Sequence, residues 1–265
     1  MNEYNFGDTD GYRNGAKNNA VRLKDLFPRP TQDSDQENHD YPDLHFMYAD
    51  SDSLANEIAE LYSYTEQPEF QYNVKAFEDY MEMMKLVPCW KRLSATEKGD
   101  IIVTLLDQMD VADKSVRLKC TRCFLYLVQG CWAECQSDVE QHLYAKENVL
   151  LLYRYSVFSA FIELFFAEAD ACSVAIQRKV SVNIFDSTEL RVILSVLYTF
   201  VEIIRNIKDD ECEEDVSLRN DFLNEICNPM RDEFLPVKLF SMVTRFGGGS
   251  APHYAIKKIL LVIWK

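Results

Sequence analysis

The segment 190–204 limits the possible folds of this chain more than any other part of the sequence. If it forms an α-helix, its polar residues recur at i, i+4, i+8 and i+11 and make one narrow stripe: Arg191, Ser195, Thr199 and Glu202. The positions between them are apolar. A helix of this kind has to be covered on nearly all sides by other helices. We therefore expect it to be buried except along the polar stripe.

Helical periodicity continues through most of the sequence after residue 50. The apolar spacing predicts helices at 52–64, 70–85, 95–109, 113–129, 138–153, 156–168, 188–207, 217–227, 234–246 and 254–265. One strand-like alternation, at Val180, Val182 and Ile184, is too short and solitary to build a sheet.

Capping signals mark where several of these helices begin. In a capping box, a Ser side chain accepts the backbone N–H three residues on, and the Glu at that position reaches back to the cap. Two pairs have this spacing and a third is a related form: Ser94 with Glu97, Ser137 with Glu140, and Asp186 with Glu189. We expect a helix to begin at each pair.

Many short helices, some of them apolar on most sides, favour an all-α fold. The architecture they suit best is an armadillo/HEAT-like α-solenoid of stacked antiparallel helices, in which each unit buries its apolar face against its neighbours. No repeat of fixed period is visible in the sequence, so a globular helical bundle stays open as the alternative.

Composition divides the chain into two expected regions. Residues 1–49 contain Gly, Asn, Asp and Pro in excess and predict a disordered acidic and polar tail, followed by a helical-repeat domain over 50–265. From Thr31 through Val74 there are eleven carboxylates and no Lys or Arg. Such a block is typical of a solvated segment, and the alternative is an interaction tail for a basic partner.

The overall charge and hydropathy argue against a nucleic-acid-binding protein and against a membrane-spanning protein. With 28 Lys and Arg against 43 Asp and Glu, the net charge is −15, which weighs against nucleic-acid binding by the whole chain. No run reaches the roughly 18 apolar residues of a membrane span. The first 20 residues are polar and show no secretory signal. We therefore expect a cytoplasmic protein with reduced, separately buried cysteines.

Four cysteines have a spacing that raises the question of a zinc site: Cys120, Cys123, Cys131 and Cys135. On one continuous helix the first and last would lie about 22 Å apart, far too distant to share a metal. A break at Gly130 is the alternative that would fold the two pairs together. We expect four buried thiols without metal.

Signs of catalysis are also incomplete. Cys172 and Arg178 have the C-x5-R spacing of cysteine phosphatases, but the intervening residues lack the glycines of a phosphate loop. The Gly247–Gly249 run lacks the Lys and Ser/Thr of a phosphate-binding motif, and the nearby His253 has no catalytic partner. We therefore predict no catalytic, metal-binding or cofactor-binding residues. A regulatory enzyme of the cysteine-phosphatase or zinc-dependent class is the alternative.

The C-terminal end is basic within an acidic chain. From Arg231 to Lys265 there are six bases and two acids, a local charge of +4. Arg245, Lys257 and Lys258 are candidates for contact with an acidic partner or an inositol phosphate, near the N-terminus of the last predicted helix. The alternative is that they are solvated surface charges. The apolar run before Lys265 also predicts exposed apolar surface on that helix, as in a fragment of a longer protein.

Five blocks, in this order, resemble the N-terminal region of the striatin-interacting protein (STRIP) family: DSDSLANEIAELYSYTEQPEFQYNVKAFEDYM at 50–81, LYLVQGCWAECQSD at 125–138, NVLLLYRYSVF at 148–158, LRVILSVLYTFVEIIR at 190–205 and VKLFSMVTRFGGGSAPHYAIKKILLVIWK at 237–265. The resemblance covers about residues 44–265. The acidic stretch Asp209–Asp215 matches no block, and the family's long C-terminal half has no counterpart in this sequence.

The resemblance implies a non-catalytic helical-repeat scaffold of the striatin-interacting phosphatase and kinase (STRIPAK) complex. By the same resemblance its partners would be striatin, protein phosphatase 2A and germinal-centre kinases. The complex would influence Hippo signalling, cell shape and the cytoskeleton. The family supplies no catalytic residues, which agrees with the incomplete catalytic motifs of this sequence.

Overall fold

The computed structural model describes residues 67–177, 187–229, 233–249, 251 and 254–265. The predicted tail 1–49, the predicted helix 52–64 and the alternation at 180–184 lie outside the described residues. So do Arg178 and His253.

The described part of the chain is helical and contains no β-strand, which confirms the all-α prediction. Its helices are α2 (Gln67–Met83), α3 (Ala95–Met109), α4 (Lys114–Val128), α5 (Asp138–Arg154), α6 (Val157–Gln177), α7 (Thr188–Arg205), α8 (Glu213–Ile226), α9 (Leu235–Gly247) and α10 (Ile256–Trp264). Two 3-10 turns, η2 (Trp90–Arg92) and η3 (Trp132–Glu134), lie in the connections.

Local capping decides several helix starts. The capping box of Ser94 and Glu97 is present with both of its hydrogen bonds. Ser137 caps α5 by accepting the N–H of Glu140, but the Glu140 side chain binds the backbone N–H of Gln136 instead of closing the box. The N-cap of α7 is Ser187, so the helix does not begin at the predicted Asp186.

Helices α6 and α8 extend by at least four residues beyond their predicted ranges. α6 continues beyond 168 to Gln177, in a stretch without Gly or Pro to stop it. α8 begins at Glu213 instead of 217, because Cys212 accepts the N–H of Asp215 and the first turn carries acidic residues. Those acids are favourable at the positive end of the helix dipole.

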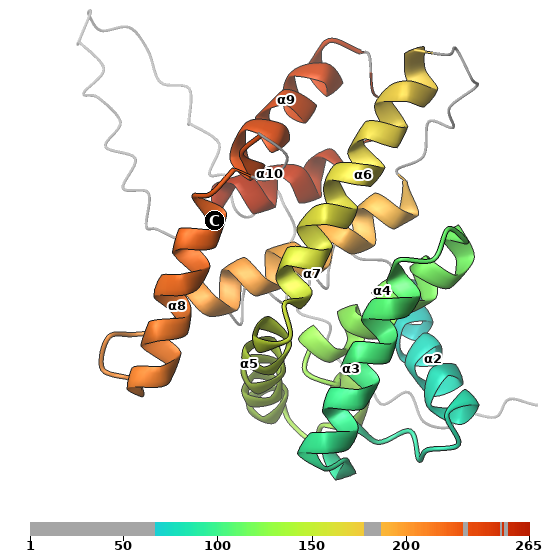
Figure 1. The fold of residues 1–265 in the computed structure, drawn as a ribbon, viewed down its shortest axis with the longest axis vertical. Helices are drawn as coiled ribbons and strands as arrows, with labels where there is room; N and C mark the ends of the chain where they lie inside the picture. Colours follow the sequence, from blue (N-terminus) through green and yellow to red (C-terminus); the bar gives the residue numbers. More distant parts are fainter. Residues whose placement is uncertain (1–66, 178–186, 230–232, 250, 252–253) are drawn as a thin grey trace, which may run out of the picture. The chain divides into compact units, whose positions relative to one another are not determined.

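Helix α7 lies at the centre of the described core. It packs against α4, α5, α6, α8 and α10, and Figure 1 shows α6 crossing in front of it. Leu194, Leu197 and Phe200 are completely buried. The core also contains the Phe side chains of α6; the ring centroid of Phe158 lies 4.6 Å from that of Phe222 of α8, with the two rings tilted by 50°.

The predicted exposure of the α7 polar stripe is wrong, because Ser195, Thr199 and Glu202 are all buried. The two hydroxyls donate hydrogen bonds to helix carbonyls one turn earlier, Ser195 to Arg191 and Thr199 to Ser195. Polar groups can be buried when such bonds satisfy them.

Glu202 is compensated by charge as well as by hydrogen bonding. Its carboxylate accepts from Asn206 Nδ2 at 2.8 Å and pairs with Arg205 of its own helix. It also lies 3.5 Å from Lys265 Nζ, next to the end of α10. The helix therefore buries its polar stripe as well as its apolar faces.

The predicted apolar surface on the last helix is confirmed. Leu260 and Trp264, one turn apart on α10, are both about half exposed. No single helix among the described residues is long and apolar enough to cross a membrane; α5 and the first part of α6 meet those criteria only together, across a bend of 79°.

Gly130 makes a close approach that a larger residue would prevent. It has a φ of 79°, and a Cβ atom there would lie 2.2 Å from the carbonyl oxygen of Gln141 in α5. We expect Gly130→Ala to lower the free energy of unfolding by about 2 kcal/mol, as measured by urea denaturation. Gly247→Ala is the control, since its Cβ would meet no atom within 4 Å. Equal losses in the two variants would contradict this explanation.

Candidate functional site

A charged cluster joins α2, α4 and α7. Glu69, in the first turn of α2, accepts a hydrogen bond from Arg122 of α4 at 2.9 Å and another from Arg191 of α7. Asn73 accepts from the same Arg122 guanidinium at 3.0 Å and donates to Gln129. The side chains of Glu69 and Arg122 are 15% and 9% exposed, so the pairing takes place largely away from water.

Lys258 of α10 adds a third cation to this cluster. Its pKa is lowered to about 8, mainly by burial and also by the positive charge of Arg191, while the carboxylate of Glu69 opposes the shift. Both oxygens of Glu69 already accept from the two arginines. The cluster thus holds three basic side chains near one carboxylate. This excess of positive charge would favour the binding of an anion.

The predicted anion-contact residues have different surroundings. Arg245, in the last turn of α9, and Lys257 are exposed. Lys258 is half-buried and close enough to Arg191 for repulsion. The two lysines are adjacent on a helix and so point about 100° apart. Because α9 and α10 pack against each other, the three residues lie on neighbouring helices.

Other basic residues of the C-terminal end form ion pairs within the protein. Lys238 donates to Asp170 of α6 at 2.7 Å and to Glu233, and Lys265 pairs with the buried Glu202. Sequence reasoning did not assign Glu69 or Arg122 to any site, and Arg191 only to a polar stripe. The sequence singled out Glu69 only as the last of the eleven carboxylates between Thr31 and Val74. That pattern does not indicate which bases Glu69 would pair with.

We expect Lys258→Met to raise the free energy of unfolding by about 1–2 kcal/mol at pH 7, because methionine fills similar space without a buried charge. The pKa of folded Lys258, about 8, is below its ordinary value of 10.5. The unfolded chain therefore binds more protons between these values, and wild-type stability rises with pH across them. The gain should accordingly fade above about pH 8.

The exposed neighbour Lys257 supplies the matched control for this measurement. Thermal or urea unfolding of Lys257→Met should differ little from wild type at any pH between 7 and 10. If both methionine variants showed the same pH profile, the explanation from burial and Arg191 would be wrong.

The cysteines lack the arrangement of a zinc site. No group of three or more Cys, His, Asp or Glu side chains in the described ranges is placed to hold a metal ion. Cys120, Cys123 and Cys131 are buried thiols, as predicted, and burial raises the pKa of Cys120 to about 11. Cys212 and Cys227 are exposed, against prediction, because they cap the two ends of α8.

The cysteine-phosphatase alternative does not fit the backbone. Cys172 lies within α6, and the helix continues through the next five positions to Gln177. Their N–H groups therefore belong to the helix ladder instead of turning toward an anion. Burial also raises the pKa of the Cys172 thiol, with Glu168 contributing, which disfavours a reactive thiolate.

Comparison with known proteins identifies the family. The model of the N1221-like protein family matches residues 42–265. Striatin-interacting protein 1 of Mus musculus is 40% identical over 228 residues, which cover 84% of this chain and 27% of the relative.

Two further relatives give the same result. Striatin-interacting protein 2 of Homo sapiens is 43% identical over 230 residues, which cover 85% of this chain and 28% of the relative. The Striatin-interacting protein 1 homolog of Danio rerio is 37% identical over 248 residues, 92% of this chain and 30% of the relative. This chain thus spans less than a third of the length of these relatives. It belongs to the N1221-like family, together with the striatin-interacting proteins.

Proposed function

We propose that this chain is a non-catalytic interaction subunit that binds striatin. The observation that carries the proposal is its identity of about 40% to proteins named for an interaction with striatin. The packed helices support it, because they offer extended surfaces for protein contact. The helical backbone around Cys172 and the raised pKa of its thiol argue in the same direction.

The proposal has finer parts that rest on the family resemblance. The helices would stack as an armadillo/HEAT-like solenoid, and the chain would act as a scaffold in the cytoplasm. Protein phosphatase 2A and germinal-centre kinases would be further partners in the assembly. Hippo signalling, cell shape and the cytoskeleton would be the processes that the assembly regulates.

Binding of purified striatin to the full chain, measured by isothermal titration calorimetry, tests the central claim. We expect a saturable complex with the folded chain. The enzyme alternative is tested in parallel by metal analysis of the purified protein and by phosphatase assays of wild type and Cys172→Ser. A folded chain that does not bind striatin would overturn the proposal. Stoichiometric zinc, or phosphatase activity lost in the Cys172→Ser variant, would favour the alternative.

A second proposed contact is electrostatic and involves Arg245, Lys257 and Lys258. The three cations gathered around Glu69 favour it, as do the exposed charges of Arg245 and Lys257. The ligand would be an acidic segment of a partner or an inositol phosphate. Inositol hexakisphosphate should bind wild type more weakly as salt rises, and Arg245→Glu/Lys257→Glu should bind less of it. Equal binding by the two proteins would remove these exposed bases from the site.

A further inference from the structure

One face of α5 presents two exposed apolar side chains near the start of the helix. Val139 and Leu143, one turn apart, are 70% and 60% exposed. Lys146 and Arg154 lie on the same face, because their spacing from Leu143 is three and eleven residues. The row therefore begins with two exposed apolar side chains and continues into basic ones.

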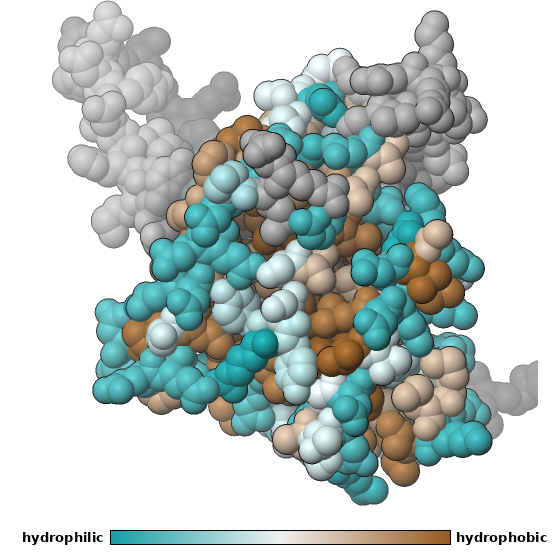
Figure 2. All heavy atoms as spheres, in the orientation of Figure 1, coloured by the Kyte–Doolittle hydropathy of each residue, from teal (hydrophilic) through white to brown (hydrophobic). Residues whose placement is uncertain are grey.

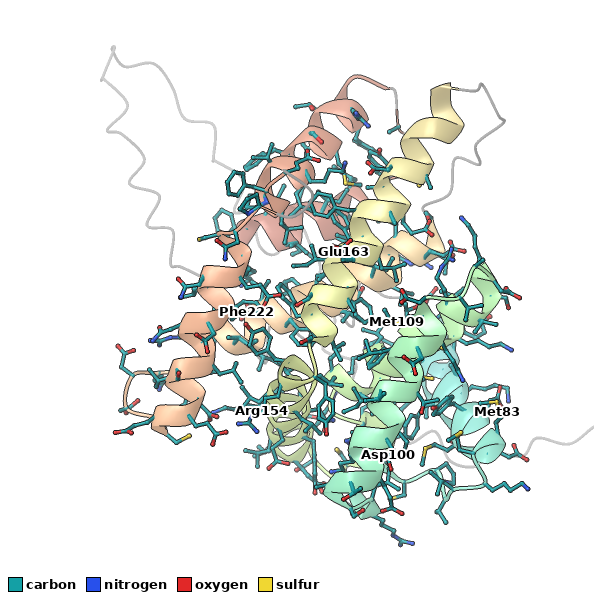
Figure 3. All side chains as sticks on the ribbon, viewed as in Figure 1. Met83, Asp100, Met109, Arg154, Glu163 and Phe222 are labelled. Atoms are coloured by element: carbon teal, nitrogen blue, oxygen red, sulfur yellow. The ribbon has the colours of Figure 1, made fainter. Side chains whose placement is uncertain are left out.

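The basic side chains of this row form ion pairs with the start of α8. Lys146 pairs with Glu211 and lies 3.5 Å from Asp215. Arg154, labelled in Figure 3, pairs with Glu214 at 2.8 Å. The acidic turn 209–215 thus borders the exposed pair, since Leu143 is only about 4.5 Å along the helix axis from Lys146.

Carboxylates dominate this border. The turn contains six of them, and four face solvent: Asp209, Asp210, Glu213 and Glu214. Figure 2 shows hydrophilic atoms gathered at the lower left, where Figure 1 places the start of α8. At the other end of the exposed pair, Asp138 is also exposed. The apolar pair accordingly lies between two acidic positions.

We propose that Val139, Leu143 and the acidic turn 209–215 form a docking surface for a basic amphipathic helix of a partner protein. A helix with apolar residues at i and i+3 or i+4 would cover the exposed pair, next to the acidic residues that pair with Lys146 and Arg154. Lys or Arg side chains beside that stripe would meet the carboxylates of the turn, which also speeds association. The surface is independent of whether the partner is striatin.

Two fluorescent 18-residue peptides of the same Leu and Lys composition provide the probe. One is ordered as an amphipathic helix, and the other is scrambled so that no apolar stripe forms. Fluorescence anisotropy with the full chain should show tighter binding of the amphipathic peptide. Val139→Asp/Leu143→Asp should weaken that binding about tenfold or more, and Asp210→Lys/Glu213→Lys should reduce its dependence on salt.

Val103→Asp is the matched control, because Val103 is an exposed apolar residue on a different helix, α3. It should bind the amphipathic peptide as wild type does, and circular dichroism should show that all variants are folded. Equal binding by wild type and Val139→Asp/Leu143→Asp, or equal binding of both peptides, would overturn the proposal. So would self-association of the chain that Val139→Asp/Leu143→Asp abolishes, since a second copy would then be the occupant.

Discussion

Replacing Glu69 by Gln should lower the free energy of unfolding by about 3 kcal/mol. The substitution removes the charge that Arg122 and Arg191 share, and Arg122 is almost completely buried. Leaving a buried cation without its partner costs about 3–5 kcal/mol, and the partial exposure of Glu69 places the expected loss at the lower end. Urea denaturation at pH 7 measures it.

Glu78 provides the control for this substitution, because it is an exposed carboxylate on the same helix. Glu78→Gln should change stability by less than about 0.5 kcal/mol. A double-mutant cycle with Arg122→Gln should give a coupling energy of about 1 kcal/mol or more. Independent, additive effects of Glu69→Gln and Arg122→Gln would show that the pair does not hold α2 against α4.

Replacing Leu197 by Ala should cost about 2–5 kcal/mol, because the deleted methyl groups leave a cavity on the central helix α7. Leu197 is 0% exposed, and α7 is enclosed by neighbours that cannot easily close the space. Urea denaturation with an unchanged m-value would assign the loss to the native state.

Ser195→Ala is the matched substitution for this test. Ser195 is buried on the same helix, but its hydroxyl donates only to the Arg191 carbonyl of its own helix. Alanine leaves no large cavity there, so the cost should be about 1 kcal/mol or less. Similar losses for Leu197→Ala and Ser195→Ala would mean that packing around α7 is not what stabilises it.

The sequence alone located each of the described helices, although α6 and α8 extend beyond their predicted ranges, because the signals that form a helix lie within one or two turns. The apolar period places α3 at the predicted 95–109, and the reciprocal bonds of Ser94 and Glu97 start it. Apolar content also identified α7 as the most enclosed helix, since so many apolar side chains can be covered only by surrounding layers.

Only the tertiary structure decided which charges meet. Glu69 and Arg191 are 122 positions apart, and no local pattern relates them. For the same reason the sequence could not show that Lys265 would pair with Glu202. Nor could it show that Lys258 would lie close to Arg191 while Lys257 is exposed. A polar stripe read from one helix predicts exposure, but its burial depends on hydrogen bonds and partner charges supplied by distant segments. Those partners exist only once the helices have packed.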